Sequence, residues 1–177
     1  RVALVPESVG LLVANGHRVL VESNAGKNAN FNDNEYSESG AEIIYDTQEV
    51  FKADIILKVS PPNEQEIKMM KHKQILFSAL QLSAQPKSTL VKLMEKKITA
   101  IAWDYIEDES GSFPIIRSMS EIAGTTSVLI AAELMSNANE GKGLMLGGLA
   151  GITPPELVII GAGTVGQFAA SAALSLG

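Results

Sequence analysis

The chain holds 177 residues, of which 46% are hydrophobic and 19% charged, so it can bury a substantial core. Its 20 acidic and 14 basic residues give a net charge of -6, and no stripe of Lys and Arg could neutralise a phosphate backbone, which argues against a nucleic-acid partner. The lack of cysteine excludes disulfides, thiolate metal sites and cysteine nucleophiles. The two histidines lack the spacing of metal ligands, so no metal site is expected.

No segment approaches the ~18 uninterrupted apolar residues of a membrane-spanning helix, so we expect no membrane insertion and a cytoplasmic protein. The sequence starts at Arg1 without a methionine and enters an apolar run at once. We therefore expect the true N-terminus, together with the first strand of the first domain, to lie ahead of Arg1.

Short apolar runs rich in Val and Ile alternate with helical patterns over the first hundred or so residues, which is typical of βα units and a parallel sheet. The predicted strands cover residues 18–22, 41–45, 54–59, 74–79 and 98–103. The predicted helices cover residues 6–14, 33–39, 47–52, 63–70 and 86–96. The fold class is therefore expected to be α/β.

A helix and a long loop are predicted next. Ser118 and Glu121 have the S-x-x-E spacing of a capping box, which predicts a helix over residues 119–135. The segment 143–155 is rich in Gly and Pro and is typical of a loop between domains. We expect a first domain over residues 1–118, a connecting helix and loop over 119–156, and the start of a second domain over 157–177.

The end of the chain carries a glycine motif. Residues 157–160 (Leu-Val-Ile-Ile) form a predicted buried strand, and residues 167–176 form an alanine-rich predicted helix. Between them lies Gly-Ala-Gly-Thr-Val-Gly, and G-x-G-x-x-G in this context is typical of the dinucleotide-binding turn of a Rossmann domain. Gly161 would permit the tight turn, Gly163 the approach of a pyrophosphate, and Gly166 the packing of helix on strand. A glycine turn without a ligand is the alternative.

The cofactor is also expected to contact Thr164 and Val165 of the turn and Gln167 at the start of the predicted helix. The first N–H groups of this helix are free, and its positive dipole end favours phosphates. We expect NAD as the cofactor, although the acidic residue that distinguishes NAD from NADP is expected ~20 positions past the glycines, beyond Gly177. Because the rest of such a domain is absent, we expect residues 1–177 alone to be inactive, and the unpaired apolar face of 167–176 to favour a homo-oligomer.

Several stretches together resemble the N-terminal part of the alanine dehydrogenase and nicotinamide nucleotide transhydrogenase family. They are residues 1–6, 40–43, 53–59, 74–77, 119–124 and 146–166. The resemblance implies a first, Rossmann-like domain that supplies the substrate pocket and a long helix leading to an NAD-binding domain. It also implies NAD-dependent conversion of L-alanine to pyruvate and ammonia, and the reverse, so the expected partner is a small amino acid or 2-oxo acid.

The resemblance further implies roles for two side chains. Arg1 falls on the arginine that holds the substrate carboxylate, a task suited to a planar bidentate donor. Ser120 falls on a serine that contacts the cofactor. An exposed terminal arginine and an ordinary helix residue are the respective alternatives.

Two positions depart from the alanine dehydrogenase pattern. In place of the second lysine of Lys-Val-Lys, which follows Lys58, this chain has Ser60, and in place of the histidine of Leu-His-Leu it has Gln81. Neither side chain titrates near neutral pH, so neither can act as a general acid or base. Strand periodicity would put Lys58 and Ser60 on one face, and we hypothesise that Lys58 partly substitutes. The alternative is a lysine with its head in solvent.

Three functions remain open at this stage. The first is a divergent alanine dehydrogenase, and the second is the NAD-binding alpha subunit of a proton-translocating transhydrogenase, which also lacks the lysine and the histidine. The third is an NAD(H)-binding protein without dehydrogenase activity. The spaced Arg, Gln and Asp of the transhydrogenase loop are absent from residues 113–118, and the Met-Ser-Glu sequence at 119–121 favours the dehydrogenase.

Overall fold

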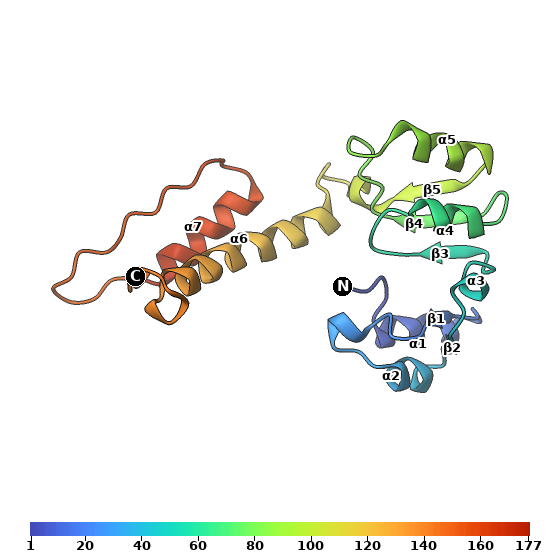
Figure 1. Cartoon of the computed structure of the whole chain (residues 1–177), viewed down its shortest axis with the longest axis horizontal. Helices are drawn as coiled ribbons and strands as arrows, with labels where there is room; N and C mark the ends of the chain where they lie inside the picture. The colour runs from blue at the N-terminus through green and yellow to red at the C-terminus, as the bar shows by residue number, and fades with distance from the viewer. The chain divides into compact units, whose positions relative to one another are not determined.

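The computed structural model describes all residues from 1 to 177 and forms two compact units, residues 1–105 and 106–177 (Figure 1). The first unit contains five strands and the helices that connect them, whereas the second is built on two helices. None of the helices combines the length and hydropathy needed to cross a bilayer.

All strand pairs in the first unit are parallel, as the alternation of strands and helices predicts. The strands are β1 (Leu20–Glu22), β2 (Glu42–Ile44), β3 (Ile55–Leu57), β4 (Ile75–Ser78) and β5 (Thr99–Ala102). Each lies within a range predicted from the sequence. The predicted parallel pairing is thus confirmed. The strands form two sheets, one of β1 and β2 and one in the order β3-β4-β5, and β1 and β3 form no ladder with each other.

The helices of the first unit follow the prediction to within two residues at each end. They are α1 (Pro6–Ala14), α2 (Asp33–Glu38), α3 (Thr47–Val50), α4 (Glu64–Met69) and α5 (Lys87–Glu95), with 3-10 turns η1 (Lys27–Ala29) and η2 (Trp103–Tyr105). Asparagine side chains fix two of the starts. Asn63 accepts from the N–H groups of Gln65 and Glu66 at 2.9 Å each, and Glu66 closes a capping box on α4.

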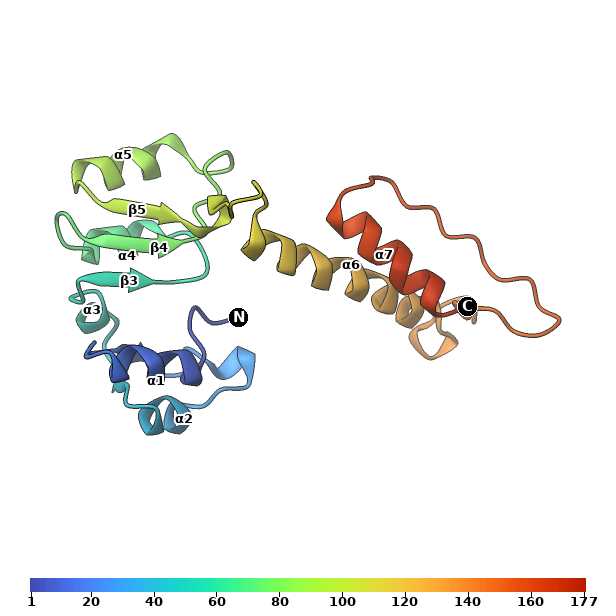
Figure 2. The same ribbon diagram turned by 180° about the vertical axis from the view of Figure 1, so that it is seen from behind.

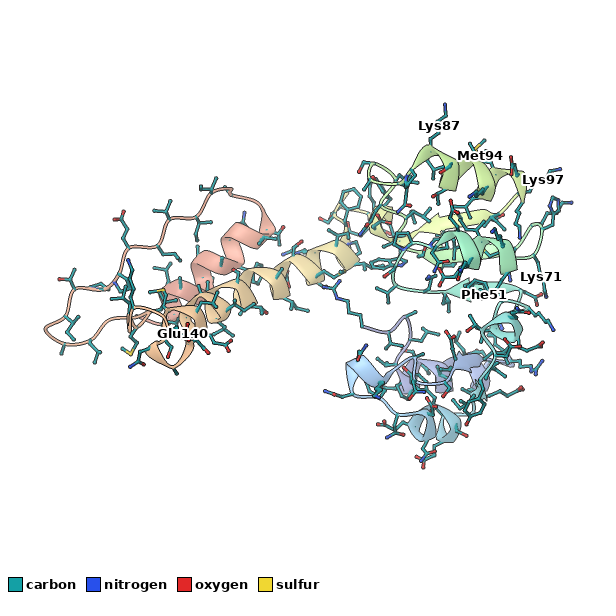
Figure 3. The ribbon with its side chains drawn as sticks, in the orientation of Figure 1. Phe51, Lys71, Lys87, Met94, Lys97 and Glu140 are labelled. Carbon is teal, nitrogen blue, oxygen red and sulfur yellow. The ribbon has the colours of Figure 1, made fainter.

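Each sheet has its own hydrophobic core. Val9, Tyr36 and Ala41 form the core beside β1 and β2. The core beside the second sheet contains Phe51, Ile56, Ile67, Met70, Leu76, Leu80 and Leu93. The buried Gln74 amide donates to the carbonyl of Phe51 at 2.8 Å and so fixes the end of this sheet at which β4 begins. Figure 3 labels Phe51, Lys71 and Lys97 at this end of the sheet. The carboxyl ends of β3, β4 and β5 therefore lie at the opposite end.

The second unit consists of α6 (Pro114–Met135), the short η3 (Asn137–Asn139) and α7 (Thr164–Ser175). In both views α7 lies alongside α6 (Figures 1 and 2). A Cβ on Gly124 of α6 would lie 2.4 Å from the carbonyl oxygen of Val165 and 2.8 Å from Cβ of Phe168. Only a glycine at this position lets the two helices approach so closely.

Three predictions in this unit are wrong. The helix predicted from residue 119 begins at Pro114, and Ser118 lies inside it, where its hydroxyl donates to the carbonyl of Pro114. The S-x-x-E spacing also occurs within helices, and Glu121 instead accepts from Arg117 at 3.0 Å. Residues 157–160 form no strand, because no other segment of these residues pairs with them. Helix α7 begins at Thr164, inside the glycine motif, rather than at residue 167.

Candidate functional site

The glycine motif forms a tight turn whose shape depends on two of its three glycines. Gly161 has a φ of +111°, a conformation that other residues rarely adopt. A Cβ on Gly166 would lie 2.1 Å from the carbonyl oxygen of Gly161, so the turn could not close over a larger residue. These two glycines therefore have structural roles in the turn itself.

Gly163 has no such structural reason to be a glycine. Its φ of -74° and ψ of -174° are open to any residue, and a Cβ built on it would meet no heavy atom within 4 Å. Its missing side chain therefore leaves open space directly before the first turn of α7. This is the position where the dinucleotide motif brings a pyrophosphate against the backbone.

The N-terminus of α7 faces this space without a side-chain cap. The first N–H groups of a helix have no partner within it, and they carry its positive dipole end. Gln167 closes the first turn, with its N–H donating to the carbonyl of Gly163 at 3.0 Å and its side-chain amide donating to Ala162 at 3.3 Å. The free donors of Thr164, Val165 and Gly166 therefore suit an anionic group.

Two open pockets flank the turn within the second unit. One, of about 450 Å³, lies between residues 157–166 and the face of α6 that carries Val128. The other, of about 380 Å³, lies between the starts of α6 and α7. Ser120 lines both pockets. Ser120 and Gly161 are 41 positions apart in the sequence, but the structure places both of them along the same pocket.

Arg117 is a site residue that the sequence analysis missed. It lines the smaller pocket with Ser120, Thr164 and Gln167, and its side chain is 62% exposed while it pairs with Glu121. The i, i+4 spacing of Arg117 and Glu121 was the available signal, but it has meaning only on a helix that begins before Arg117. Gly124 was missed for a different reason, because the crossing of α6 and α7 is not visible in the sequence.

In the first unit, Lys58 directly follows β3. Its Nζ donates to both carboxylate oxygens of Glu66 at 2.6 Å, and the two side chains are 21% and 20% exposed. The alternative of a lysine head in solvent is therefore wrong. Ser60 lies in a bend after β3 ends at Leu57. The argument that strand periodicity places Lys58 and Ser60 on one face is wrong as well, because the strand does not reach them.

Gln81 lies in the loop after β4 with a φ of +45°, which is unusual for a residue with a side chain. Its N–H and that of Leu80 each donate to the Asp104 carboxylate at 3.0 Å. Leu80 is buried in the core, whereas Gln81 is exposed. The sequence analysis missed Asp104, although a carboxylate directly after a predicted strand was a visible signal. Open parallel sheets bind ligands at this carboxyl edge.

Arg1 is exposed and forms no ion pair in the structure. Figures 1 and 2 place the N-terminus at the side of the first unit on which β3, β4 and β5 end. The buried Tyr36 hydroxyl donates to the carbonyl of Leu4 at 2.8 Å and so holds the segment that carries Arg1. Burial, and secondarily the Glu35 carboxylate, raise the pKa of Tyr36 above its usual value.

No group of three or more His, Asp or Glu side chains is arranged to hold a metal ion.

Comparison with known families covers nearly the whole chain. The family model described as "Alanine dehydrogenase/PNT, N-terminal domain" matches residues 1–123. The model described as "Alanine dehydrogenase/PNT, C-terminal domain" matches residues 127–177. The α/β fold with parallel strands is thus the fold of a known family.

Curated relatives show the same likeness. An alanine dehydrogenase of Methanococcus maripaludis is 41% identical over 178 residues, which cover 100% of this chain and 48% of the relative. Alanine dehydrogenase 2 of Staphylococcus aureus is 40% identical over 177 residues, with 100% and 47% covered. The chain therefore spans about half the length of the curated relatives it matches.

Solved structures agree with these relatives. An L-alanine dehydrogenase superposes with a TM-score of 0.92 at 37% identity, covering 99% of this chain and 48% of that one. A transhydrogenase from Sinorhizobium meliloti superposes with a TM-score of 0.82 at 27% identity, covering 100% and 50%. Both branches of the family thus share this fold.

Proposed function

The chain belongs to the alanine dehydrogenase/PNT family, and on that premise we propose that the whole protein is an NAD-dependent oxidoreductase that interconverts an amino acid and its 2-oxo acid. L-alanine and pyruvate are the expected pair, because relatives at 41% and 40% identity are named alanine dehydrogenases. In the forward direction the amino acid, water and NAD⁺ yield the 2-oxo acid, ammonium, NADH and a proton.

The observation that carries the cofactor assignment is the open space at Gly163. Gly161 and Gly166 are required by the turn, but Gly163 is required only if something approaches its backbone closely. The uncapped α7 N-terminus and the Ser120 side chain border the same space, so backbone N–H groups and a hydroxyl would hold the phosphates. NAD, when bound, supplies the hydride acceptor.

The substrate end of the proposal rests on the carboxyl edge of β3, β4 and β5. The Arg1 guanidinium would bind the substrate carboxylate through two parallel hydrogen bonds. The exposed Gln81 amide can donate to a substrate carbonyl but cannot exchange a proton with it near neutral pH. Lys58 could assist only by leaving Glu66, which now occupies it. We expect these side chains to orient the substrate better than they move protons.

The expectation that Ser60 and Gln81 stand where the family has its acid and base supports two further candidate functions. One is the NAD-binding subunit of a transhydrogenase, which the likeness to the Sinorhizobium meliloti protein supports. The other is an NAD(H)-binding protein without dehydrogenase activity.

A single set of assays on the whole protein separates the three. The absorbance of NADH is followed with NAD⁺ and a panel of amino acids, and in reverse with 2-oxo acids and ammonium. Amino-acid-dependent formation of NADH, greatest with L-alanine, is the expected result. Hydride exchange between NADH and an NADP analogue, without amino-acid oxidation, would favour the transhydrogenase. Binding of NADH with neither activity would leave the non-catalytic protein.

A further inference from the structure

Two adjacent backbone N–H groups in the loop after β4 converge on one carboxylate. The N–H of Leu80 donates to Oδ1 of Asp104 and that of Gln81 to Oδ2, both at 3.0 Å. Asp104 lies two residues past β5, whose Ala102 pairs with Ser78 of β4. The ends of the two neighbouring strands are thus joined by the Asp104 side chain rather than by the ladder alone.

This contact accompanies an unfavourable backbone conformation. Gln81 has a φ of +45°, which costs free energy for any residue with a Cβ and persists only where its surroundings enforce it. The buried Leu80 anchors the loop on the core side, at 6% exposure, while Asp104 fixes the next N–H group. Leu80 and Asp104 together therefore fix the backbone position of the exposed Gln81 in the loop after β4.

The residue before Asp104 secures the neighbouring strand end. The indole Nε1 of Trp103 donates to the carbonyl of Lys58 at 3.4 Å. The short η2 turn thus contacts the loop after β3, which begins with Lys58, and the loop after β4, which carries Gln81. It therefore links these two loops at that edge of the sheet.

We propose that Asp104 is a positioning residue, which holds the backbone of Gln81 in its left-handed conformation so that the Gln81 amide can donate a hydrogen bond to the carbonyl oxygen of a 2-oxo acid. This inference rests on the proposed function and adds a residue to it. Asp104 itself does not touch the substrate. Its carboxylate is already occupied by the two N–H groups, and its effect on turnover passes through Gln81.

The test is a double-mutant cycle in the whole protein with the variants D104N, Q81A and the pair. In D104N one oxygen becomes an NH₂ group that cannot accept from a backbone N–H. We expect D104N to raise KM for the 2-oxo acid and lower kcat by roughly tenfold to a hundredfold, because a small misplacement of an orienting group costs that much. The affinity for NADH should not change. The double variant should be no slower than Q81A.

A matched control and a structural readout accompany the cycle. Asp46 also accepts a backbone N–H, that of Gln48 at 2.9 Å, as the cap of α3, and D46N should leave the kinetics unchanged. Amide hydrogen exchange should be faster at Leu80 and Gln81 in D104N and unchanged along β4. If D104N does not fold, D104E keeps the charge and displaces it, and the same KM and kcat changes are expected.

The outcomes separate the two proposals. A wild-type protein that oxidises no amino acid would contradict the proposed function and this inference with it. An active wild type in which the effects of D104N and Q81A multiply independently would overturn the positioning role alone. So would unchanged exchange at Leu80 and Gln81 in D104N.

Discussion

The Nζ atom of Lys58 lies 2.6 Å from each carboxylate oxygen of Glu66. Glu66 also accepts from the N–H of Asn63 at 2.7 Å and thereby caps α4. Lys58, for which the sequence suggests a catalytic role as a hypothesis, is thus part of the contact between the end of β3 and the start of the next helix. Its structural role and any catalytic role can be separated by experiment.

We predict that K58A destabilises the protein by about 1–3 kcal/mol, because the largely buried Glu66 carboxylate is left without its charged partner. Urea unfolding measures this loss. If Lys58 also takes part in the reaction, turnover of the whole protein should fall sharply under conditions in which the variant remains folded. An unchanged rate would dispose of the catalytic role while leaving the structural one. K92A is the control, because Lys92 pairs with the more exposed Glu64 at 2.6 Å and its loss should change little.

A second prediction concerns alkaline pH. The pKa of Tyr36 is raised by burial, so the folded state keeps a proton that the unfolded state loses near pH ~10. Its contribution is fully present below that pH and is lost as the pH rises through the higher folded value. The variant Y36F should lack this alkaline loss, although it is less stable at neutral pH by about 1 kcal/mol without the bond to Leu4.

The control for that experiment is Y45F, since Tyr45 is 85% exposed. Thermal melting of the wild type and both variants between neutral pH and alkaline pH gives the comparison. If Y36F and Y45F lose stability equally with rising pH, the buried hydroxyl is not the source of the effect.

The helix crossing at Gly124 gives a third prediction. G124A should destabilise the packing of α6 on α7 by about 1–3 kcal/mol, because the added methyl group would lie 2.4 Å from a backbone oxygen that cannot move freely. G10A is the matched change in α1, because it also replaces a glycine within a helix by alanine. A Cβ on Gly10 would lie 3.8 Å from its nearest neighbour, which is an ordinary van der Waals contact. Thermal melting should show a loss for the first variant and no loss for the second. Equal melting temperatures would mean that the crossing is looser than described.

Local patterns were sufficient to predict most of the first unit. The strands were visible because each contains a short run of apolar residues between helical patterns, and the helices because polar residues such as Asn63 mark their starts. The pairing of strands into two sheets was not visible. It depends on which edges meet, and no single segment encodes that information.

The candidate site was predicted in part. The glycine motif was visible because the turn itself requires Gly161 and Gly166, and Gly163 lies between them at the spacing of the dinucleotide-binding pattern. Asp104 acts through the backbone of a loop 23 and 24 positions earlier in the chain, and such a contact leaves no periodic signal. The start of α6 was misplaced because the sequence contains two start signals. The capping pattern at Ser118 predicts a start at residue 119, whereas Pro114, which suits the first turn of a helix, marks the start in the structure.

The central claim, that the glycine turn binds the dinucleotide, is tested most directly by titrating NADH into the whole protein and its G163V variant. The valine side chain would fill the space that the pyrophosphate needs, and it meets no protein atom near its Cβ. We predict that G163V melts like the wild type but binds NADH at least about tenfold more weakly, a loss of roughly 1.4 kcal/mol. Binding of NADH by G163V with wild-type affinity would contradict the account.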